Sequence, residues 1–333
     1  MGEQRRPLTM EDREEISRCL AVGLTNKEIA AYIDRDESVV CREIARNGGR
    51  ERYRAHAAQQ RAEQERRRPK ERKLDSDRAL RGRVVSGLRV GWSPDQIAGR
   101  LTYDRCCGEA VDTVSHEAIY TWIYALPKGE LARLGIELRS GRERRKPRGR
   151  RGSPGARIVG MRSIDERPAE VADRQVPGHW EGDLIIGRNG ASAAATLVER
   201  KSRFTLIVPL PFGRTSEAVC DALVETVANV PGQLMKSITW DQGTEMAGHA
   251  ALSLATDIDV YFAHPHSPWE RGTNENTNGL IREYLPKGTK IPSDSEFLNS
   301  VSHSLNTRPR RILGYRTPAE VFVEMLSELA STA

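Results

Sequence analysis

Long hydrophobic runs are absent from this chain of 333 residues. Hydrophobic residues make up 38% of it and its mean hydropathy is −0.58. No apolar segment approaches the roughly 18 residues that a membrane helix needs. The N-terminal residues include arginines and lack the apolar centre of a secretory signal. These absences predict a cytoplasmic protein with no membrane partner.

Cysteine is scarce, with five residues in all. Their number is odd, and none of them shows the C-x-x-C spacing of a zinc or redox site. A disulfide framework and a structural zinc are therefore not expected, and a reducing compartment is. We expect each cysteine to act as a small buried or half-buried hydrophobe. The five are Cys19, Cys41, Cys106, Cys107 and Cys220.

Positive charge is concentrated in two segments. The net charge is only +6, yet residues 42–73 contain 12 Lys or Arg against 5 Asp or Glu, and residues 139–151 contain 8 against 1. Such local basicity is typical of segments that meet a polyanion. A solvated linker explains either run alone. Because both runs adjoin helical patterns, contact with DNA phosphates is the better interpretation.

Residues 1–52 predict a first, all-α helix-turn-helix domain. Apolar residues recur at helical spacing from Ile16 to Leu24, and Thr25 with Glu28 forms a capping box for a second helix. A third helix follows a short turn and would enter the major groove. A plain three-helix packing module would show the same periodicity. The side chains expected on DNA here are Arg35, Ser38, Val39, Arg42, Arg46, Arg50 and Arg54.

Two further segments complete the N-terminal half. Residues 53–75 predict a basic helical linker, and residues 76–138 predict a second helix-turn-helix domain. In the latter, Ser93 and Gln96 form another capping box, and residues 115–124 continue with a second helical pattern.

Residues 139–175 predict a basic, Arg-rich linker that is too charged to pack by itself. We expect it to contact DNA phosphates. The residues concerned are Arg144, Arg145, Lys146 and Arg148.

From residue 176 the pattern changes to strands that alternate with helices, which is typical of an α/β domain. Residues 176–292 predict a catalytic core with a mixed five-stranded sheet, and residues 293–333 a C-terminal helical extension. The expected strands lie at 181–187, 194–199, 204–210, 238–241 and 260–263. The fold class is therefore multidomain, with an all-α helix-turn-helix region followed by an α/β domain.

Three acidic residues carry the chemistry that this domain suggests. Asp183 lies in an apolar run, Asp241 ends another, and Glu275 lies in a polar stretch with 33 residues between it and Asp241. Carboxylates at strand ends are costly to bury unless they are compensated, and divalent cations are the usual reason. Three converging carboxylates can hold two Mg²⁺ about 4 Å apart for phosphodiester cleavage.

Other residues near these acids have alternative roles. Glu181 shares a strand face with Asp183 and could contribute a ligand, although a structural role is favoured. Trp269 could stack on an unpaired base at the cut end, although a packing role is favoured. Four cations flank Glu275 and are expected to hold the DNA backbone. They are Arg271, Arg282, Lys287 and Lys290.

The polar motifs around the three acids occur in a recognisable order. They are His179–Asp183, Trp240–Glu245, Asn274–Gly279, Leu305–Arg310 and Thr317–Glu320. With this set, the chain from Leu8 to about Phe322 resembles the bacterial insertion-sequence transposases of the IS-thirty type. That family belongs to the ribonuclease H-like, retroviral-integrase-like DDE superfamily.

The resemblance implies that Asp183, Asp241 and Glu275 are both the catalytic and the metal-binding triad. It implies two Mg²⁺ ions, with Mn²⁺ as a substitute, and action at the nucleoid. It also implies binding to double-stranded DNA at terminal inverted repeats, strand cleavage by water, and transfer of the 3′ end to target DNA. Two DNA ends must be cut in concert, so we expect a homodimer or a larger synaptic assembly.

The chain departs from the family pattern at four positions. Asp34 replaces the usual Gly in the first recognition turn, and Asp tolerates positive φ better than most residues. Val39 and Cys41 stand where small hydroxyl residues are common, which implies an altered base preference. Glu270 replaces an expected Gln. Two rival hypotheses remain, a non-catalytic transposase-derived repressor and a ribonuclease H-like nuclease.

Overall fold

The computed structural model describes residues 7–67, 71–127, 129–136, 158, 160–265 and 267–332. The chain divides into two compact units, residues 1–71 and 72–333, and each is described by itself. Arg144, Arg145, Lys146 and Arg148, predicted to contact DNA, lie outside the described residues. Within the described ranges, no helix is both long enough and apolar enough to cross a membrane.

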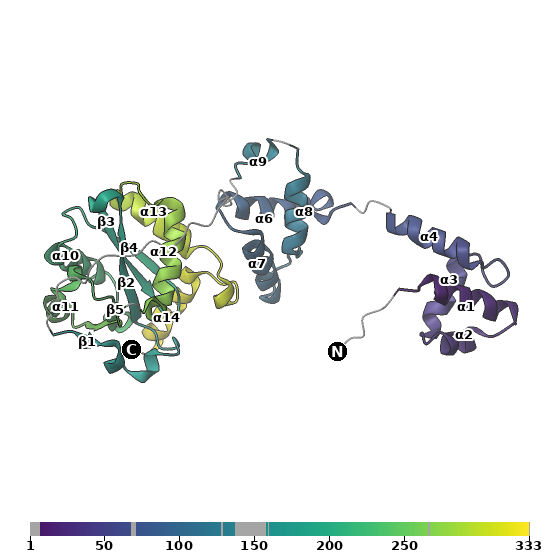
Figure 1. Ribbon diagram of the computed structural model, residues 1–333, viewed down its shortest axis with the longest axis horizontal. Helices are drawn as coiled ribbons and strands as arrows, with labels where there is room; N and C mark the ends of the chain where they lie inside the picture. Colours follow the sequence, from purple (N-terminus) through teal and green to yellow (C-terminus); the bar gives the residue numbers. More distant parts are fainter. Residues whose placement is uncertain are drawn as a thin grey trace. The chain divides into compact units, whose positions relative to one another are not determined.

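The first unit is a helical bundle (Figure 1). Its helices are α1 (Met10–Ala21), α2 (Asn26–Tyr32), α3 (Glu37–Arg46) and α4 (Ala55–Arg67). Thr25 and Glu28 form the predicted capping box of α2. Asp34 has φ +52° in the turn before α3, so an aspartate does adopt the left-handed conformation there. Tyr53 and Ala58, in the predicted linker, are buried in the core of this unit.

The second unit begins with five helices. They are α5 (Lys73–Ser76), α6 (Arg78–Arg89), α7 (Pro94–Cys106), α8 (His116–Ala125) and α9 (Glu130–Arg133). The predicted capping box of Ser93 and Gln96 starts α7. Trp122 is buried in the core of these helices, whereas Tyr124 is exposed. DNA binding by the α7–α8 pair stays a prediction.

A six-stranded mixed sheet forms the centre of the α/β part, with the order β1-β6-β5-β2-β3-β4. The strands are β1 (Arg162–Ser163), β2 (His179–Ile186), β3 (Ala193–Glu199), β4 (Thr205–Pro209), β5 (Ser237–Trp240) and β6 (Asp259–Phe262). The predicted count of five strands is wrong. The additional strand, β1, is two polar residues long and pairs with β6, so it leaves no apolar run in the sequence.

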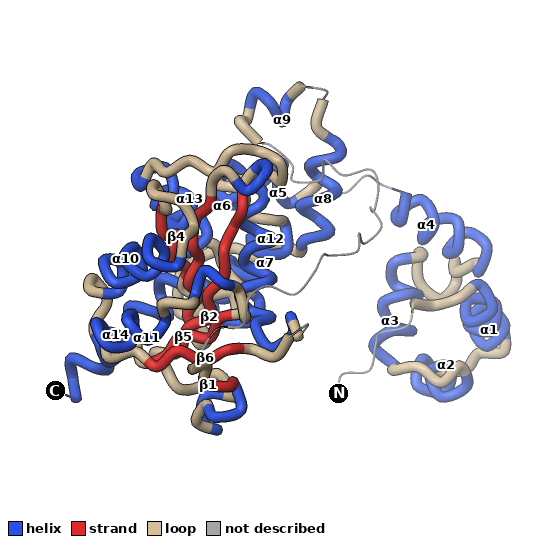
Figure 2. The backbone as a smooth tube through the Cα atoms, turned by 60° about the vertical axis from the view of Figure 1, so that its left-hand side comes forward, coloured by secondary structure: helices blue, strands red, loops and turns tan. Residues whose placement is uncertain are grey.

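Helices cover both faces of this sheet. Figure 2 shows α10 (Ser216–Val227), α11 (His249–Thr256) and α14 (Pro318–Thr332) on one side of the strands and α12 (Gly272–Tyr284) on the other. Helix α13 (Ser295–Asn306) packs with α12 in a second core. Strands alternate between the cores, because Ala193 and Ala195 face one and Ala194 faces the other.

Short 3₁₀ turns connect these elements. They are η1 (Ile164–Glu166), η2 (Ala169–Val171), η3 (Arg188–Gly190), η4 (Gly232–Leu234), η5 (Thr244–Met246), η6 (Pro268–Arg271) and η7 (Arg311–Leu313). Of these, η5 and η6 follow β5 and β6 at the edge of the sheet where the acidic residues lie.

Within the second unit, α7 packs against the segment that precedes α14. The Tyr315 ring lies over Gly99 so closely that a Cβ on Gly99 would be 2.2 Å from it. The Tyr315 hydroxyl donates to Asp95, and Arg100 forms a 2.7 Å ion pair with Glu320. Only a glycine leaves room for the Tyr315 ring at this position, so the close packing of α7 on this segment depends on Gly99.

The cysteines follow the expectation only in part. Cys19 and Cys220 are buried and Cys41 is half-buried, as predicted. The expectation is wrong for Cys106 and Cys107, which are exposed at the C-terminal end of α7.

Candidate active site

Two of the three predicted acids lie side by side at the centre of the sheet. Asp183 is in the middle of β2, a central strand, and Asp241 directly follows β5. The two strands run parallel with Glu181 opposite Thr239. Two residues farther along each strand, the same register brings Asp183 and Asp241 together. Their side chains are 31% and 43% exposed.

A tight packing contact fixes this part of the sheet. Gly182 faces the ring of Trp240, and a Cβ on Gly182 would lie 2.0 Å from that ring. The indole of Trp240 in turn donates to Glu245 over 3.3 Å. The glycine before Asp183 and the tryptophan before Asp241 therefore lock the two acids into one local arrangement.

Arg271 bridges the two aspartates. Its guanidinium nitrogens lie 3.5 Å from an Asp183 oxygen and 3.1 Å from an Asp241 oxygen. It also donates to the carbonyl of Gly182 over 2.9 Å, and its side chain is only 13% exposed. A cationic group thus already lies between the two carboxylates.

The carboxyl groups here are destabilised as anions. Burial raises the pKa of Asp183, the Arg271 charge lowers it, and the Asp241 charge raises it again. Burial also raises the pKa of Glu245, with smaller contributions in the same direction from both aspartates. A cation placed among these groups would relieve their repulsion, which is the condition that favours a bound metal.

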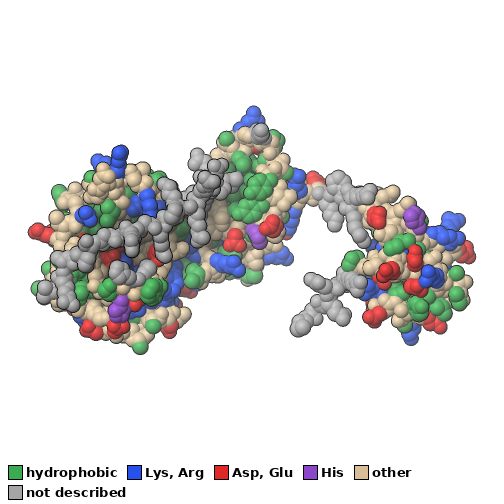
Figure 3. All heavy atoms as spheres, viewed as in Figure 1, with side chains coloured by type: hydrophobic (Ala, Val, Ile, Leu, Met, Phe, Trp, Pro, Cys, Tyr) green, Lys and Arg blue, Asp and Glu red, His purple; other side chains and the backbone are tan. Residues whose placement is uncertain are grey.

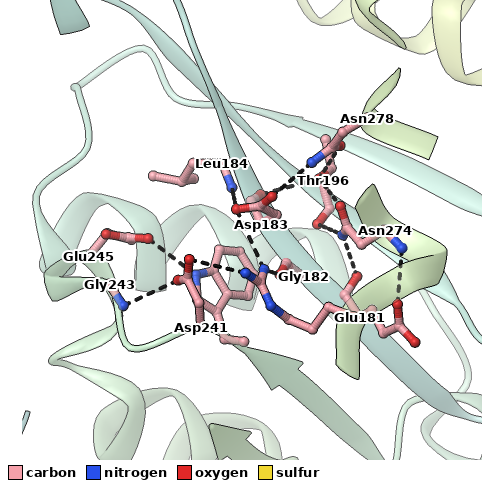
Figure 4. A network of polar contacts seen from close by, with 12 residues as sticks. Glu181, Gly182, Asp183, Leu184, Thr196, Asp241, Gly243, Glu245, Asn274 and Asn278 are labelled. Atoms are coloured by element: carbon pink, nitrogen blue, oxygen red, sulfur yellow. Dashed lines mark hydrogen bonds and ion pairs between the residues drawn. The ribbon is translucent and has the colours of Figure 1, made fainter. Parts of the chain in front are cut away.

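Asn278 completes the surroundings of Asp183 (Figure 4). Its side-chain amide donates to an Asp183 oxygen over 2.9 Å, and the Thr196 hydroxyl donates to the Asn278 oxygen over 3.0 Å. Thr196 is directly opposite Asp183 in the β2–β3 pairing. The backbone amide of Leu184 occupies the other Asp183 oxygen. This carboxylate is held from both sides.

Glu181 has a structural position. It is completely buried, forms a 3.0 Å ion pair with Arg200, and accepts the backbone amide of Asn274 over 2.9 Å. The Asn274 side chain donates back to the carbonyl of Glu181 over 2.7 Å. These bonds attach the start of α12 to β2 and leave Glu181 no role as a metal ligand in this arrangement.

Glu275 is on α12 and its side chain is exposed. Two residues of α12 near the face of Glu275 contact β2 or its end, because Asn278 binds Asp183 and Arg282 binds the carbonyl of Ile186. At 3.6 residues per turn, Glu275 lies within about 60° of these side chains around the helix axis.

The structure brings Asp183 and Asp241 together but does not bring the Glu275 carboxylate to them. Among the described residues, no group of three or more His, Cys, Asp or Glu side chains is arranged to hold a metal ion. The two aspartates with a cation between them nevertheless fit a divalent metal, whose preferred ligands are carboxylate oxygens.

The predicted phosphate contacts near the site have different outcomes. Arg271 is directed at the aspartates, and Arg282 donates to the carbonyls of Ile186 and Leu285. Lys287 is exposed just beyond α12.

The first unit presents most of its predicted DNA contacts to solvent. Ser38, Arg42, Arg46, Arg50 and Arg54 are exposed on or after α3. On the face drawn in Figure 3, blue Lys and Arg side chains are interspersed with red Asp and Glu side chains over this unit.

The other two predicted contacts of this unit face inward. Arg35 pairs with Asp12 over 3.3 Å, and Val39 packs against the core of the unit. Both side chains are half-buried, and their contact with DNA stays a prediction.

Sequence reasoning missed Asn278 and Thr196 as neighbours of the acids. A signal existed for Asn278, because it follows Glu275 by three residues and so shares its helix face. Thr196 comes from another strand, and only the sheet register reveals its position.

Two segments of the chain match known protein families. Residues 4–47 match the helix-turn-helix domain family, and residues 173–268 match the integrase core domain family. The second match contains Asp183 and Asp241 and ends before Glu275.

Similar proteins extend over nearly the whole chain. It is 41% identical to the transposase InsI for insertion sequence element IS30A of Escherichia coli, over 94% of this chain and 82% of that protein. It is 42% identical to the transposase for insertion sequence element IS1086 of Cupriavidus metallidurans, over 96% of this chain and 95% of that protein. A transposase for insertion sequence element IS4351 of Bacteroides fragilis is 37% identical, over 96% and 97%.

Proposed function

The chain belongs to the insertion-sequence transposases of the IS-thirty type, and we propose that its catalytic residues are Asp183, Asp241 and Glu275. The observation that carries this proposal is the pairing of Asp183 and Asp241 around a cationic group in an integrase-type sheet. Glu275 is included because it lies on α12, the helix that Asn278 and Arg282 attach to β2.

We propose that these carboxylates hold two Mg²⁺ ions, which Mn²⁺ can replace. When bound, the ions stabilise charge on the attacking and leaving oxygens of a phosphodiester. Asp183 is pre-oriented for ligation by Asn278 and by the backbone amide of Leu184. Asp241 is held by the backbone amide of Gly243 and by Arg271.

The proposed reaction has two successive phosphoryl transfers. Water attacks the phosphodiester at the end of the element, and the bond to the departing oxygen breaks to leave a free 3′-hydroxyl. That hydroxyl then loses its proton and attacks a phosphodiester of the target DNA, where the bond between phosphorus and the target's 3′ oxygen breaks. The target strand leaves with a free 3′-hydroxyl, and a new strand junction forms. The exposed Lys287 is available to hold the DNA backbone during both steps, and Arg282 would join it by exchanging its bonds to the carbonyls of Ile186 and Leu285 for phosphate.

We propose that the first unit recognises the terminal inverted repeats. Its exposed α3 residues Ser38, Arg42 and Arg46 lie where a recognition helix meets the major groove. Since the substrate is bacterial DNA, we place the protein's site of action at the nucleoid.

Two ends must be joined together, so we further propose a homodimer or larger assembly on DNA. Light scattering of the protein with and without DNA ends would test the assembly.

The central experiment is strand cleavage of labelled DNA from the ends of the element, with Mg²⁺. Asp183→Ala is expected to lower the cleavage rate by about a thousandfold or more while leaving DNA binding intact. Asp221→Ala, an exposed acid on α10, is the matched control and should cleave normally.

Two outcomes would favour the rival hypotheses. Binding without any cleavage by the unaltered protein would indicate a transposase-derived repressor. Cleavage that ignores the element sequence and is unaffected by Arg42→Ala would indicate a general ribonuclease H-like nuclease.

A further inference from the structure

Trp269 is exposed beside the acidic site. It lies in η6, between β6 and α12, and its relative exposure is 70%. All five tryptophans are in the described part of the chain, and Trp269 is the one among the exposed large hydrophobics. A large aromatic side chain usually contributes 150–250 Å² of buried surface. The exposure excludes the core-packing role considered from the sequence.

Glu270, the residue after Trp269, binds to the chain segment that follows β6. Glu270 accepts the backbone amide of His264 over 2.7 Å and also contacts the His264 ring over 2.8 Å. The second ring nitrogen of His264 lies 2.9 Å from Asp165. Since His264 is the second residue after β6, these contacts attach η6 to the end of the sheet.

Arg271 anchors the same turn to the catalytic acids. It binds Asp241 over 3.1 Å and the carbonyl of Gly182 over 2.9 Å. Two residues of extended chain span at most about 7 Å. The Cα atom of Trp269 is therefore within that distance of the Cα atom of a residue that touches both aspartates.

These observations describe an exposed aromatic side chain in a turn whose next two residues, Glu270 and Arg271, are attached to the end of the sheet and to the acidic site. Resting on the proposed function, we propose that Trp269 is a DNA-binding residue that stacks on an unpaired base next to the phosphate to be cut. An indole face binds any base by stacking and carries no sequence preference. The contact would hold the strand end open and in place for reaction.

The test uses intrinsic fluorescence and binding, without divalent metal, so that it does not depend on cleavage. The probes are a blunt duplex and the same duplex with a single-stranded oligothymidylate tail. We expect the tailed duplex to quench the fluorescence of the full-length protein more than the blunt duplex does. Trp122, Trp180 and Trp240 are buried and Trp92 is half-buried, so the additional quenching that Trp269→Ala removes is the part that reports on Trp269.

Binding of labelled DNA gives the second readout. Trp269→Ala is expected to bind the tailed duplex about tenfold more weakly and the blunt duplex unchanged. Trp269→Phe should retain most of the affinity because it keeps an aromatic face. Leu254→Ala, at a 90% exposed position on α11 across the sheet, is the matched control and should bind both probes normally.

Three results would overturn the proposal. They are quenching that persists in Trp269→Ala, equal loss of affinity for both duplexes, and a changed oligomeric state of Trp269→Ala with unchanged DNA binding. The last result would make the indole a contact between copies of the chain. A failure of Mg²⁺-dependent cleavage in the unaltered protein would count against the proposed function and leave the stacking test unaffected.

Discussion

Asn278 donates a hydrogen bond to Asp183 across 2.9 Å, and so connects α12 directly to the central strand of the sheet. The donor is one helical turn beyond Glu275, and its own oxygen is satisfied by Thr196. An amide in this position orients a carboxylate without adding charge. The bond therefore links the geometry of two proposed ligands, one on a strand and one on a helix.

The first prediction concerns this bond. Asn278→Ala is expected to slow strand cleavage about tenfold to a hundredfold, because a hydrogen bond to a charged group contributes about 1.5–3 kcal/mol. Asn278→Asp should be worse, since a third negative charge then faces Asp183. Single-turnover cleavage rates would measure both. Asn276→Ala, exposed on the same helix, is the control, and an equal loss there would contradict a specific role for Asn278.

The second prediction concerns Arg271 as a built-in counter-ion. Removing it in Arg271→Ala leaves two close carboxylates without a positive partner, so Mn²⁺ should bind about tenfold more tightly in the absence of DNA. Calorimetric titration with Mn²⁺ measures this, and Arg271→Lys should bind nearly as the unaltered protein does. Arg188→Ala, at an exposed position in η3, serves as the control. Weaker Mn²⁺ binding by Arg271→Ala would show that the arginine supports the site instead of competing for it.

The third prediction concerns the buried pair of Glu181 and Arg200, whose side chains are 0% and 4% exposed. Glu181→Ala leaves a buried guanidinium without its partner and should lower the free energy of unfolding by about 3–5 kcal/mol. Urea denaturation measures the change. Glu225→Ala, on the exposed surface of α10, should change it by less than about 0.5 kcal/mol. A small effect at Glu181 would mean that water reaches this pair.

The fourth prediction concerns pH. Burial lowers the pKa of His179 to about 4 from an ordinary value of 6.5, with help from Lys236 and Arg200. As pH falls below 6.5, the unfolded chain takes up the proton before the folded chain does. The stability that His179 contributes is therefore complete above pH 6.5 and is lost progressively down to about pH 4, by about 3 kcal/mol in total.

Urea denaturation at several pH values tests this expectation. His179→Asn retains a polar group that can reach Ser237, which lies 2.7 Å from the histidine ring, and should remove most of the pH dependence. His303→Gln replaces an exposed histidine and should leave the dependence unchanged. An unaltered slope in His179→Asn would assign the effect to other groups.

The sequence predicted those parts of the fold that depend on local patterns. Capping boxes at Thr25 and Ser93 begin helices where they were expected, and apolar runs became strands β2 to β6. The sixth strand could not be predicted, because two polar residues become a strand only when β6 offers them hydrogen bonds. Long-range pairing, and not local propensity, decides such an element.

The candidate site was predictable as a set of residues but not as a geometry. Strand ends indicated Asp183 and Asp241, and the parallel register brings them together. Sequence patterns do not predict that Arg271 forms ion pairs with these acids. They also do not predict that Glu181 pairs with Arg200. Side-chain direction depends on the neighbours that folding supplies, and those neighbours come from distant segments.

The packing of Tyr315 on Gly99, with the Arg100–Glu320 ion pair beside it, has a mechanical consequence. It ties the helix that begins at Ser93 to the chain segment leading into the last helix. Any DNA bound by the helices around α7 would therefore be held at a fixed distance from the proposed catalytic residues. The distance between the bound sequence and the cleaved phosphodiester would then be constant. Weakening the Tyr315–Gly99 contact would make the cleavage position variable before cleavage itself was lost.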